Sequence, residues 1–140
     1  MPEIAQSSAS LRFFGDDLDP VDLTRLLGGK PTYAIGKGDF HTYPPNRPPR
    51  IALTGFWRLS SEYEAGDQLD RQIADILATL TSDLSVWAAL VLRFKVDMFC
   101  GVWLGEESRG LGLTPQTLQK LGERGIKLGL DIYHDLPEAD

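Results

Sequence analysis

Apolar and polar side chains alternate in several segments of the chain, which is the pattern of β-strands with one buried face. The alternation predicts strands at residues 9–14, 50–62, 95–105 and 126–133, with a shorter strand at residues 31–38. In the second of these segments, the side chains expected on one shared face are Ile51, Leu53, Trp57 and Leu59. In the last segment, those expected to face the core are Ile126, Leu128, Leu130 and Ile132.

Four helices are predicted between these strands, at residues 19–28, 67–80, 83–94 and 115–124. Asp19, Asp83 and Thr114 are suitable N-caps, and leucine and isoleucine between residues 67 and 80 recur at the spacing of a single apolar stripe. The resulting order, βαββααβαβ, predicts an α+β fold. We expect a mixed or mainly antiparallel sheet with helices on one face, related to the ferredoxin-like fold.

The length and composition are those of one domain spanning residues 1–140, with 42% hydrophobic and 24% charged residues. The ends, residues 1–8 and 134–140, are expected to be flexible tails. No segment reaches the roughly 20 apolar residues that cross a bilayer. The first ten residues also lack the pattern of a signal peptide. We therefore expect a cytoplasmic protein without a membrane partner.

The net charge is -6, from 20 acidic and 14 basic residues. No gathering of basic residues is visible in the sequence, so this charge opposes binding to nucleic acid and favours a basic partner. The single cysteine, Cys100, excludes an internal disulfide and a cysteine-based metal cluster.

Residues 99–118 have the order of a phosphate-binding loop, because an apolar strand leads through a glycine-rich loop into a helix. Two features of the loop argue against phosphate binding. Leu111 stands where such a loop needs a lysine, and Glu106 and Glu107 place negative charge beside the phosphate. We therefore predict an ordinary strand-to-helix connection and no nucleotide cofactor.

Two further groups of residues have structural explanations that outweigh a catalytic one. An acidic cluster without the spacing of a calcium loop is formed by Asp16, Asp17, Asp19 and Asp22. An enzyme that uses Asp17, His41 or Cys100 would need a pocket that gathers them, and Cys100 is expected to point into the core, which argues against a nucleophile. We predict no catalytic residue, no metal site and no cofactor, and hence no enzyme.

The face of the sheet opposite the helices is the most informative predicted surface. Its side chains are Arg12, Phe14, Phe56, Arg58, Asp97, Phe99, Trp103, Lys127, Asp131 and Tyr133. A merely solvated face would carry mainly Thr, Lys and Glu, whereas aromatic rings with interspersed charges are typical of interfaces. Alternatively, this face is covered by the proline-rich loop predicted at residues 39–50 or by the first eight residues.

Four segments of the chain resemble a bacterial family: SLRFFGDDLDPVDLTRLLG, GFWRLSSE, DMFCGVWLG and GLTPQTLQKLGERGIKLGLDIY. They resemble the family catalogued as domain of unknown function 4279, over residues 10–133. The resemblance implies a small stand-alone bacterial protein, and the family has no established activity. By analogy, small acidic bacterial proteins are often immunity proteins that neutralise a neighbouring toxin.

These observations predict a non-enzymatic binding protein, in the first place an immunity protein that neutralises a basic toxin domain by direct binding. The residues expected to contact this partner are Phe14, Phe56, Arg58, Asp97, Phe99, Trp103, Glu106, Glu107, Asp131 and Tyr133. The alternative is a homodimer through the same face, with a structural or small-ligand-binding role.

Overall fold

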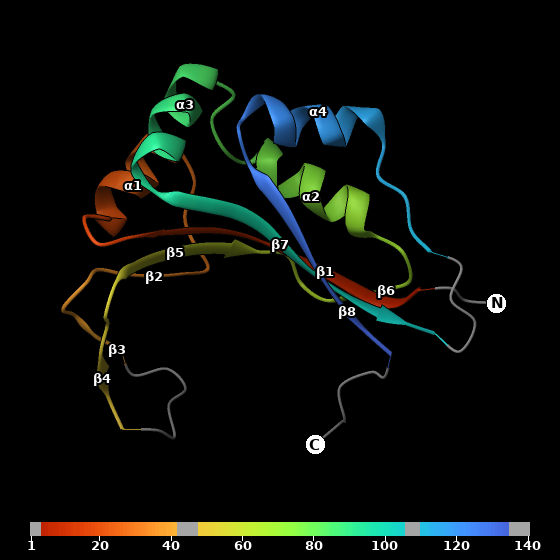
Figure 1. Ribbon diagram of the computed structural model, residues 1–140, viewed down its shortest axis with the longest axis horizontal. Helices are drawn as coiled ribbons and strands as arrows, with labels where there is room; N and C mark the ends of the chain where they lie inside the picture. The colour runs from red at the N-terminus through yellow and green to blue at the C-terminus, as the bar shows by residue number, and fades with distance from the viewer. Residues whose placement is uncertain (1–3, 42–47, 106–109, 135–140) are drawn as a thin grey trace.

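The computed structural model describes residues 4–41, 48–105 and 110–134, and within them four helices cover one face of a twisted sheet (Figure 1). The helices are α1 (Pro20–Leu27), α2 (Leu69–Ala78), α3 (Leu84–Arg93) and α4 (Pro115–Glu123). The side chains of Asp19, Asp83 and Thr114 accept hydrogen bonds from the first turns of α1, α3 and α4, as predicted. Gly28 ends α1 with a φ of 78°, in the left-handed region that favours glycine.

The main sheet is mostly antiparallel. Its strands are β1 (Ile4–Gly15), β2 (Tyr33–Ile35), β5 (Gly55–Ser60), β6 (Glu64–Ala65), β7 (Lys95–Leu104) and β8 (Lys127–Tyr133). Their order is β2-β5-β1-β7-β8, with β6 pairing on β1, and β7 with β8 is the parallel pair. The predicted α+β fold, a mixed sheet with helices on one face, is confirmed, while the relation to the ferredoxin-like fold stays a prediction.

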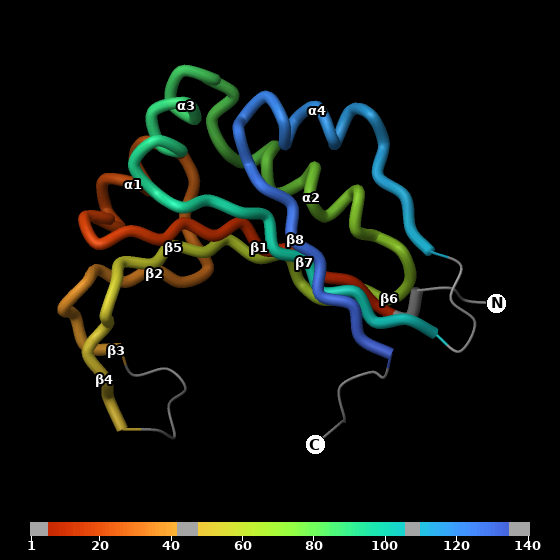
Figure 2. The backbone as a smooth tube through the Cα atoms, viewed as in Figure 1, coloured from red at the N-terminus to blue at the C-terminus, as the bar shows by residue number. Residues whose placement is uncertain are grey.

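A second, two-stranded sheet interrupts the predicted proline-rich loop. Its strands, β3 (Phe40–His41) and β4 (Arg50–Ile51), project below the left end of the main sheet in Figures 1 and 2. Residues 42–47, between the two strands, lie outside the described residues. Because β4 pairs with β3 and does not continue into β5, Ile51 and Leu53 are 54% and 87% exposed. Their predicted place on the face of Trp57 is therefore wrong.

The hydrophobic core lies between the helices and the sheet. Its centre is Phe13, which packs edge-on against Trp57 at 5.5 Å and stacks with Trp87 at 6.1 Å between ring centroids. Each indole N–H finds a partner, since Trp57 donates to the Thr24 hydroxyl and Trp87 to the Thr81 carbonyl. The largest side chains are thus buried with their polar atoms satisfied.

β1 is longer than the sequence predicted. It begins at Ile4 and not at residue 9, so residues 4–8 belong to the sheet and not to a flexible tail. The side chain of Ser7 donates to Gln72 Oε1 at 2.8 Å, and Gln72 Nε2 donates back to the Ser7 carbonyl at 2.9 Å. Both residues are buried, so this polar bridge fixes the first half of β1 to α2. At the other end, residues 135–140 lie outside the described residues.

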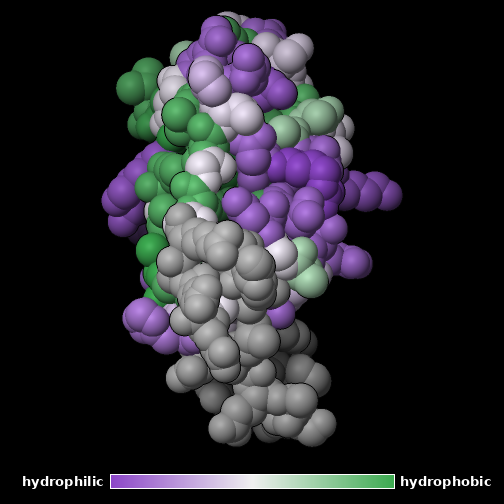
Figure 3. Space-filling model, turned by 90° about the vertical axis from the view of Figure 1, so that its right-hand side faces the viewer, coloured by the Kyte–Doolittle hydropathy of each residue, from purple (hydrophilic) through white to green (hydrophobic). Residues whose placement is uncertain are grey.

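β8 leaves part of its apolar side exposed. Leu130 and Ile132 are aligned with the buried Cys100 and Val102 of β7, but are 41% and 54% exposed. They lie on the predicted helix side of the sheet but are not buried there, because β8 is an edge strand with a neighbour on one side. Figure 3 shows a band of hydrophobic surface beside a hydrophilic area on the right-hand side of the molecule as it is drawn in Figure 1.

Candidate functional site

The sheet face that carries no described helix is the candidate site, and we name it the open face (Figure 1). Its side chains come from neighbouring strands in register and form rows across the sheet. The open face includes Ser8, Ser10, Arg12, Phe14, Tyr33, Phe56, Arg58, Asp97, Phe99, Gly101, Trp103, Lys127, Asp131 and Tyr133. The register thus brings together the aromatic and charged residues that the alternation predicted for this face.

One row across the open face is charged. Arg58 of β5 lies opposite Arg12 of β1, and Arg12 lies opposite Asp97 of β7. Asp97 in turn aligns with Lys127 of β8. The row therefore holds three cations and one carboxylate, although the chain as a whole carries a net charge of -6.

Arg12 and Asp97 form a two-point ion pair. Arg12 Nε donates to Asp97 Oδ1 at 2.9 Å, and Nη2 donates to Oδ2 at 2.7 Å. The guanidinium also lies over the ring of Phe99, 4.3 Å from its centroid. These hydrogen bonds to Asp97 raise the pKa of Arg12. The single carboxylate of the row is thus committed to Arg12.

Arg58 has no such partner among the described residues. Its Nε atom is buried and makes no hydrogen bond, and no described acidic side chain pairs with its guanidinium. The side chain is half-buried beside Phe56 on the same strand face. A buried guanidinium N–H without an acceptor is unfavourable, and since this Nε has no exposed surface, an anion in the groove would contact the Nη groups of Arg58.

Aromatic side chains close one end of the open face. Trp103 stacks on Tyr133 at 4.9 Å between ring centroids and meets Tyr63 edge-on at 5.3 Å. Gly101 is required beside them, because a Cβ atom at this position would lie 2.8 Å from the Trp103 ring. The Tyr133 hydroxyl donates to Asp131 at 2.7 Å, and this hydrogen bond raises the pKa of Tyr133.

Small residues form a hollow between this aromatic end and the charged row. A pocket of about 270 Å³ lies over Ser8, Ser10 and Gly101. Trp103 borders it on one side, and Phe99 with Arg12 borders it on the other. Larger side chains at the three small positions would fill this space, so the floor of the pocket depends on their size.

A second, larger pocket of about 610 Å³ lies between the open face and the β3–β4 hairpin. The sheet contributes Phe14 and Phe56, whose rings are 5.1 Å apart, and the hairpin contributes His41 and Arg50. Phe56 and Arg58 border both pockets. We therefore treat the two pockets as one groove, with Arg58 at its middle.

The charges that line this groove are of one sign. Among the described lining residues, the charged side chains are Arg12, Arg50 and Arg58, and none is a carboxylate. The sequence alone shows no gathering of basic residues, because these three are far apart in the chain and only the fold brings them together. In contrast to the acidic whole molecule, the groove is basic and aromatic.

The predicted contact residues differ in their burial. Phe14, Phe56, Arg58, Asp97 and Phe99 are half-buried on the open face. Trp103 is covered and only 8% exposed, because Tyr63 and Tyr133 pack against it.

The remaining predicted contacts lie at the edge of the open face or outside it. Asp131 and Tyr133 are exposed on the edge strand. Glu106 and Glu107 lie outside the described residues.

Sequence reasoning missed the residues that shape the groove. The sequence pattern assigns no face of the sheet to four residues that line the groove, namely Tyr33, His41, Arg50 and Tyr63. The floor had a usable signal, since Ser8 and Ser10 continue the alternation of β1 on the side of Arg12. An aromatic face interrupted by small residues predicts a hollow.

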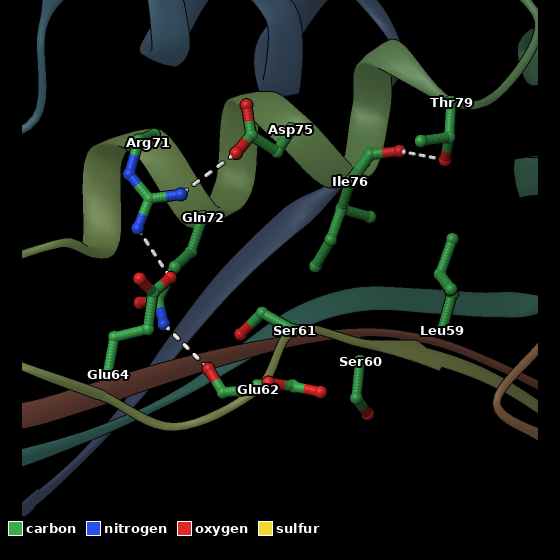
Figure 4. A pocket seen from close by; sticks show the side chains of 10 residues that line it. All are labelled: Leu59, Ser60, Ser61, Glu62, Glu64, Arg71, Gln72, Asp75, Ile76 and Thr79. Atoms are coloured by element: carbon green, nitrogen blue, oxygen red, sulfur yellow. Dashed lines mark hydrogen bonds and ion pairs between the residues drawn. The ribbon is translucent and has the colours of Figure 1, made fainter.

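Another pocket, of about 420 Å³, lies between α2 and the segment that follows β5 (Figure 4). Arg71 projects from α2 toward it, but its guanidinium is paired with Glu64 and Asp75. Gln72 donates to the Glu62 carbonyl at 2.9 Å. Since these polar groups satisfy one another, this pocket offers less to a ligand than the groove does.

The residues considered for catalysis are not gathered at one place. Cys100 is fully buried on the helix side of the sheet, and desolvation raises its pKa to about 12. His41 lines the groove on the opposite side, and Asp17 is exposed. Within the described chain, no cluster of His, Cys, Asp or Glu side chains is arranged to hold a metal ion. No described helix is long and apolar enough to cross a membrane.

The comparisons with known proteins identify the family. No curated protein and no solved structure matches the chain. The family described as domain of unknown function (DUF4279) matches residues 5–135. This range includes all the described helices and strands except the first residue of β1. The chain therefore belongs to the DUF4279 family.

Proposed function

We propose that this protein is a non-enzymatic binding protein and that its binding site is the groove of the open face. One observation carries the proposal: the fold gathers half-buried aromatic rings and two arginines around a recessed floor of small residues, and a third arginine lines the adjoining pocket. Ligand sites are typically concave and mostly apolar, with a few convergent polar groups. The groove has this character.

The recessed geometry favours the small-ligand-binding module of the alternative over the leading prediction, an immunity protein that binds a toxin through the aromatic sheet face. Protein interfaces depend on exposed aromatic anchors, whereas Trp103 is nearly buried and Phe56 and Phe99 are half-buried walls. The arginines of the groove would also repel a basic toxin domain. Toxin neutralisation, a homodimer through the open face and a cytoplasmic location stay predictions.

A neutral fluorescent probe, phenylnaphthylamine, tests the groove as a binding site. Its emission should rise on binding to the wild-type protein. Ser10→Trp should weaken this binding at least about tenfold, because the indole fills the floor of the pocket. Ser82→Trp, on an exposed turn between α2 and α3, is the matched control and should bind as the wild type does.

Circular dichroism confirms that each variant is folded. If the wild type does not bind the probe, or if Ser10→Trp binds it unchanged, the proposed binding site is wrong. The toxin prediction has a separate test, since affinity capture from a native bacterial host should then return one protein partner in equal amount.

A further inference from the structure

We infer that the ligand of the groove is a small organic anion, with a flat apolar part and one acidic group that contacts the guanidinium of Arg58. The inference rests on the proposed function and names the chemistry of its ligand. It does not depend on the family match, because it follows from the register, the burial and the charges of the open face.

The register shows that Arg58 is not paired with a carboxylate in its own row. Arg58 and Arg12 are directly opposite each other on adjacent antiparallel strands, an arrangement in which like charges repel. Asp97 is the one carboxylate aligned with them, and both of its oxygens accept hydrogen bonds from Arg12. The other described carboxylate of the open face, Asp131, is aligned with Gly101 and acts electrostatically on Arg12, so Arg58 forms no ion pair with a described residue.

The hydrogen bonding of Arg58 also shows that this side chain lacks a partner among the described residues. Its Nε is buried without an acceptor, and its side chain borders both pockets of the groove. A guanidinium presents parallel N–H groups that match the two oxygens of a carboxylate, phosphate or sulfonate. An acidic group of this kind, bound at the Nη groups, supplies the missing negative charge.

The walls of the groove define the rest of the ligand. On one side of Arg58 lie the rings of Phe14 and Phe56, and on the other lie Phe99 and Trp103. A flat apolar group fits against such rings, and pockets of about 270 and 610 Å³ hold a small molecule. The net charge of -6 opposes a long polyanion, so a small anion is favoured over nucleic acid.

Two fluorescent probes with the same ring system separate the charge from the apolar part. Anilinonaphthalene sulfonate carries an anionic group, and phenylnaphthylamine is its uncharged counterpart. The wild-type protein should bind the sulfonate about tenfold more tightly than the neutral probe, the difference that one charge-assisted hydrogen-bonded pair supplies. Arg58→Gln should abolish this preference and leave the neutral probe bound.

Control variants isolate the guanidinium of Arg58. Arg25→Gln removes the same charge from an exposed position on α1, behind the sheet, and should leave both affinities unchanged. Arg58→Lys keeps the charge but loses the paired N–H groups, so it should restore part of the preference. The melting temperature of each variant, measured in parallel, confirms that it is folded.

The outcomes distinguish the two proposals. If neither probe binds the wild type, the proposed groove itself is wrong. If both bind equally and Arg58→Gln changes neither, the groove binds apolar ligands and the anion inference is overturned. Binding at the apolar edge of β8, where Leu130 and Ile132 are exposed, would also be insensitive to Arg58→Gln and would overturn it.

Competition identifies the acidic group. Benzoate and phenyl phosphate share a ring and differ in the anion, and each should displace the sulfonate probe from the wild type. Benzoate should be the stronger competitor if the site is built for a carboxylate, and phenyl phosphate if it is built for a phosphate. Failure of both to compete, at concentrations that saturate the probe site, would contradict an anion site at Arg58.

Discussion

Arg58 and Arg12 lie directly opposite one another on β5 and β1, and the one carboxylate in their row, Asp97, is bound to Arg12. Folding thus places two like charges side by side and neutralises one of them. Such an arrangement opposes stability, and it is explained if the unneutralised arginine serves to bind an anion.

Replacement of Arg58 should therefore stabilise the protein. We expect Arg58→Gln to raise the free energy of unfolding by about 0.5 kcal/mol at low salt, because the repulsion from Arg12 is removed. The gain should shrink as salt screens the charges. Urea unfolding at two ionic strengths measures both effects, and Arg25→Gln should show no such gain. A destabilised Arg58→Gln protein would mean that Arg58 has a structural partner.

Loss of Asp97 should have the opposite effect. Asp97→Asn removes the counter-ion of Arg12 and leaves the row with three cations, so we expect a loss of about 1 to 2 kcal/mol in the free energy of unfolding. The freed Arg12 should also strengthen binding of the sulfonate probe. Asp75→Asn breaks an exposed pair with Arg71 and should change the stability little. Equal stabilities of the two variants would contradict this role of Asp97.

The hollow beside Trp103 depends on a glycine. Gly101→Ala would place a Cβ 2.8 Å from the indole, so the ring must shift, and we expect about 1 to 3 kcal/mol of destabilisation with a changed tryptophan emission. Gly129→Ala is the matched control on the adjacent strand, since its Cβ would meet nothing within 4 Å. Similar urea midpoints for both variants would show that Trp103 is free to move.

Cys100 should be unreactive in the folded protein. Burial raises the pKa of its thiol to about 12, above the value of about 8.5 for a free cysteine. A thiol reagent at about pH 8 should therefore modify Cys100 after unfolding in urea and not before. Rapid modification of the native protein would contradict the buried thiol.

The raised pKa of Cys100 also makes the free energy of unfolding depend on pH. The raised folded-state pKa favours the native state fully below about pH 8.5, and this contribution falls as the pH rises toward 12. Cys100→Ala should remove this part of the alkaline loss of stability, which urea unfolding at increasing pH measures. Identical alkaline profiles for the variant and the wild type would contradict it.

The sequence predicted those parts of the fold that depend on local chemistry. The caps Asp19, Asp83 and Thr114 begin helices as expected, since capping involves only a few neighbouring residues. The period of two in β7 assigned Cys100 to the core and Phe99 to the other face. These features need no knowledge of distant partners.

The candidate site depended on pairings that the sequence does not reveal. The two-stranded β3–β4 sheet forms within a proline-rich segment, and it brings Arg50 to the groove. Trp103 is covered because Tyr63 and Tyr133 arrive from distant segments. The opposition of Arg12 and Arg58 follows from the register of β1 and β5. Each is a long-range relationship that alternation alone leaves undetermined.

The central claim, that the groove of the open face binds a small organic anion at Arg58, is tested most directly by nuclear magnetic resonance. Isotope-labelled protein is titrated with anilinonaphthalene sulfonate, and the amide shifts are followed. We predict that the largest saturable shifts occur at Ser10, Arg58 and Gly101, and that Arg58→Gln needs about tenfold more probe to reach saturation at Ser10 and Gly101. Shifts confined to the helices or to the edge of β8 would contradict the claim.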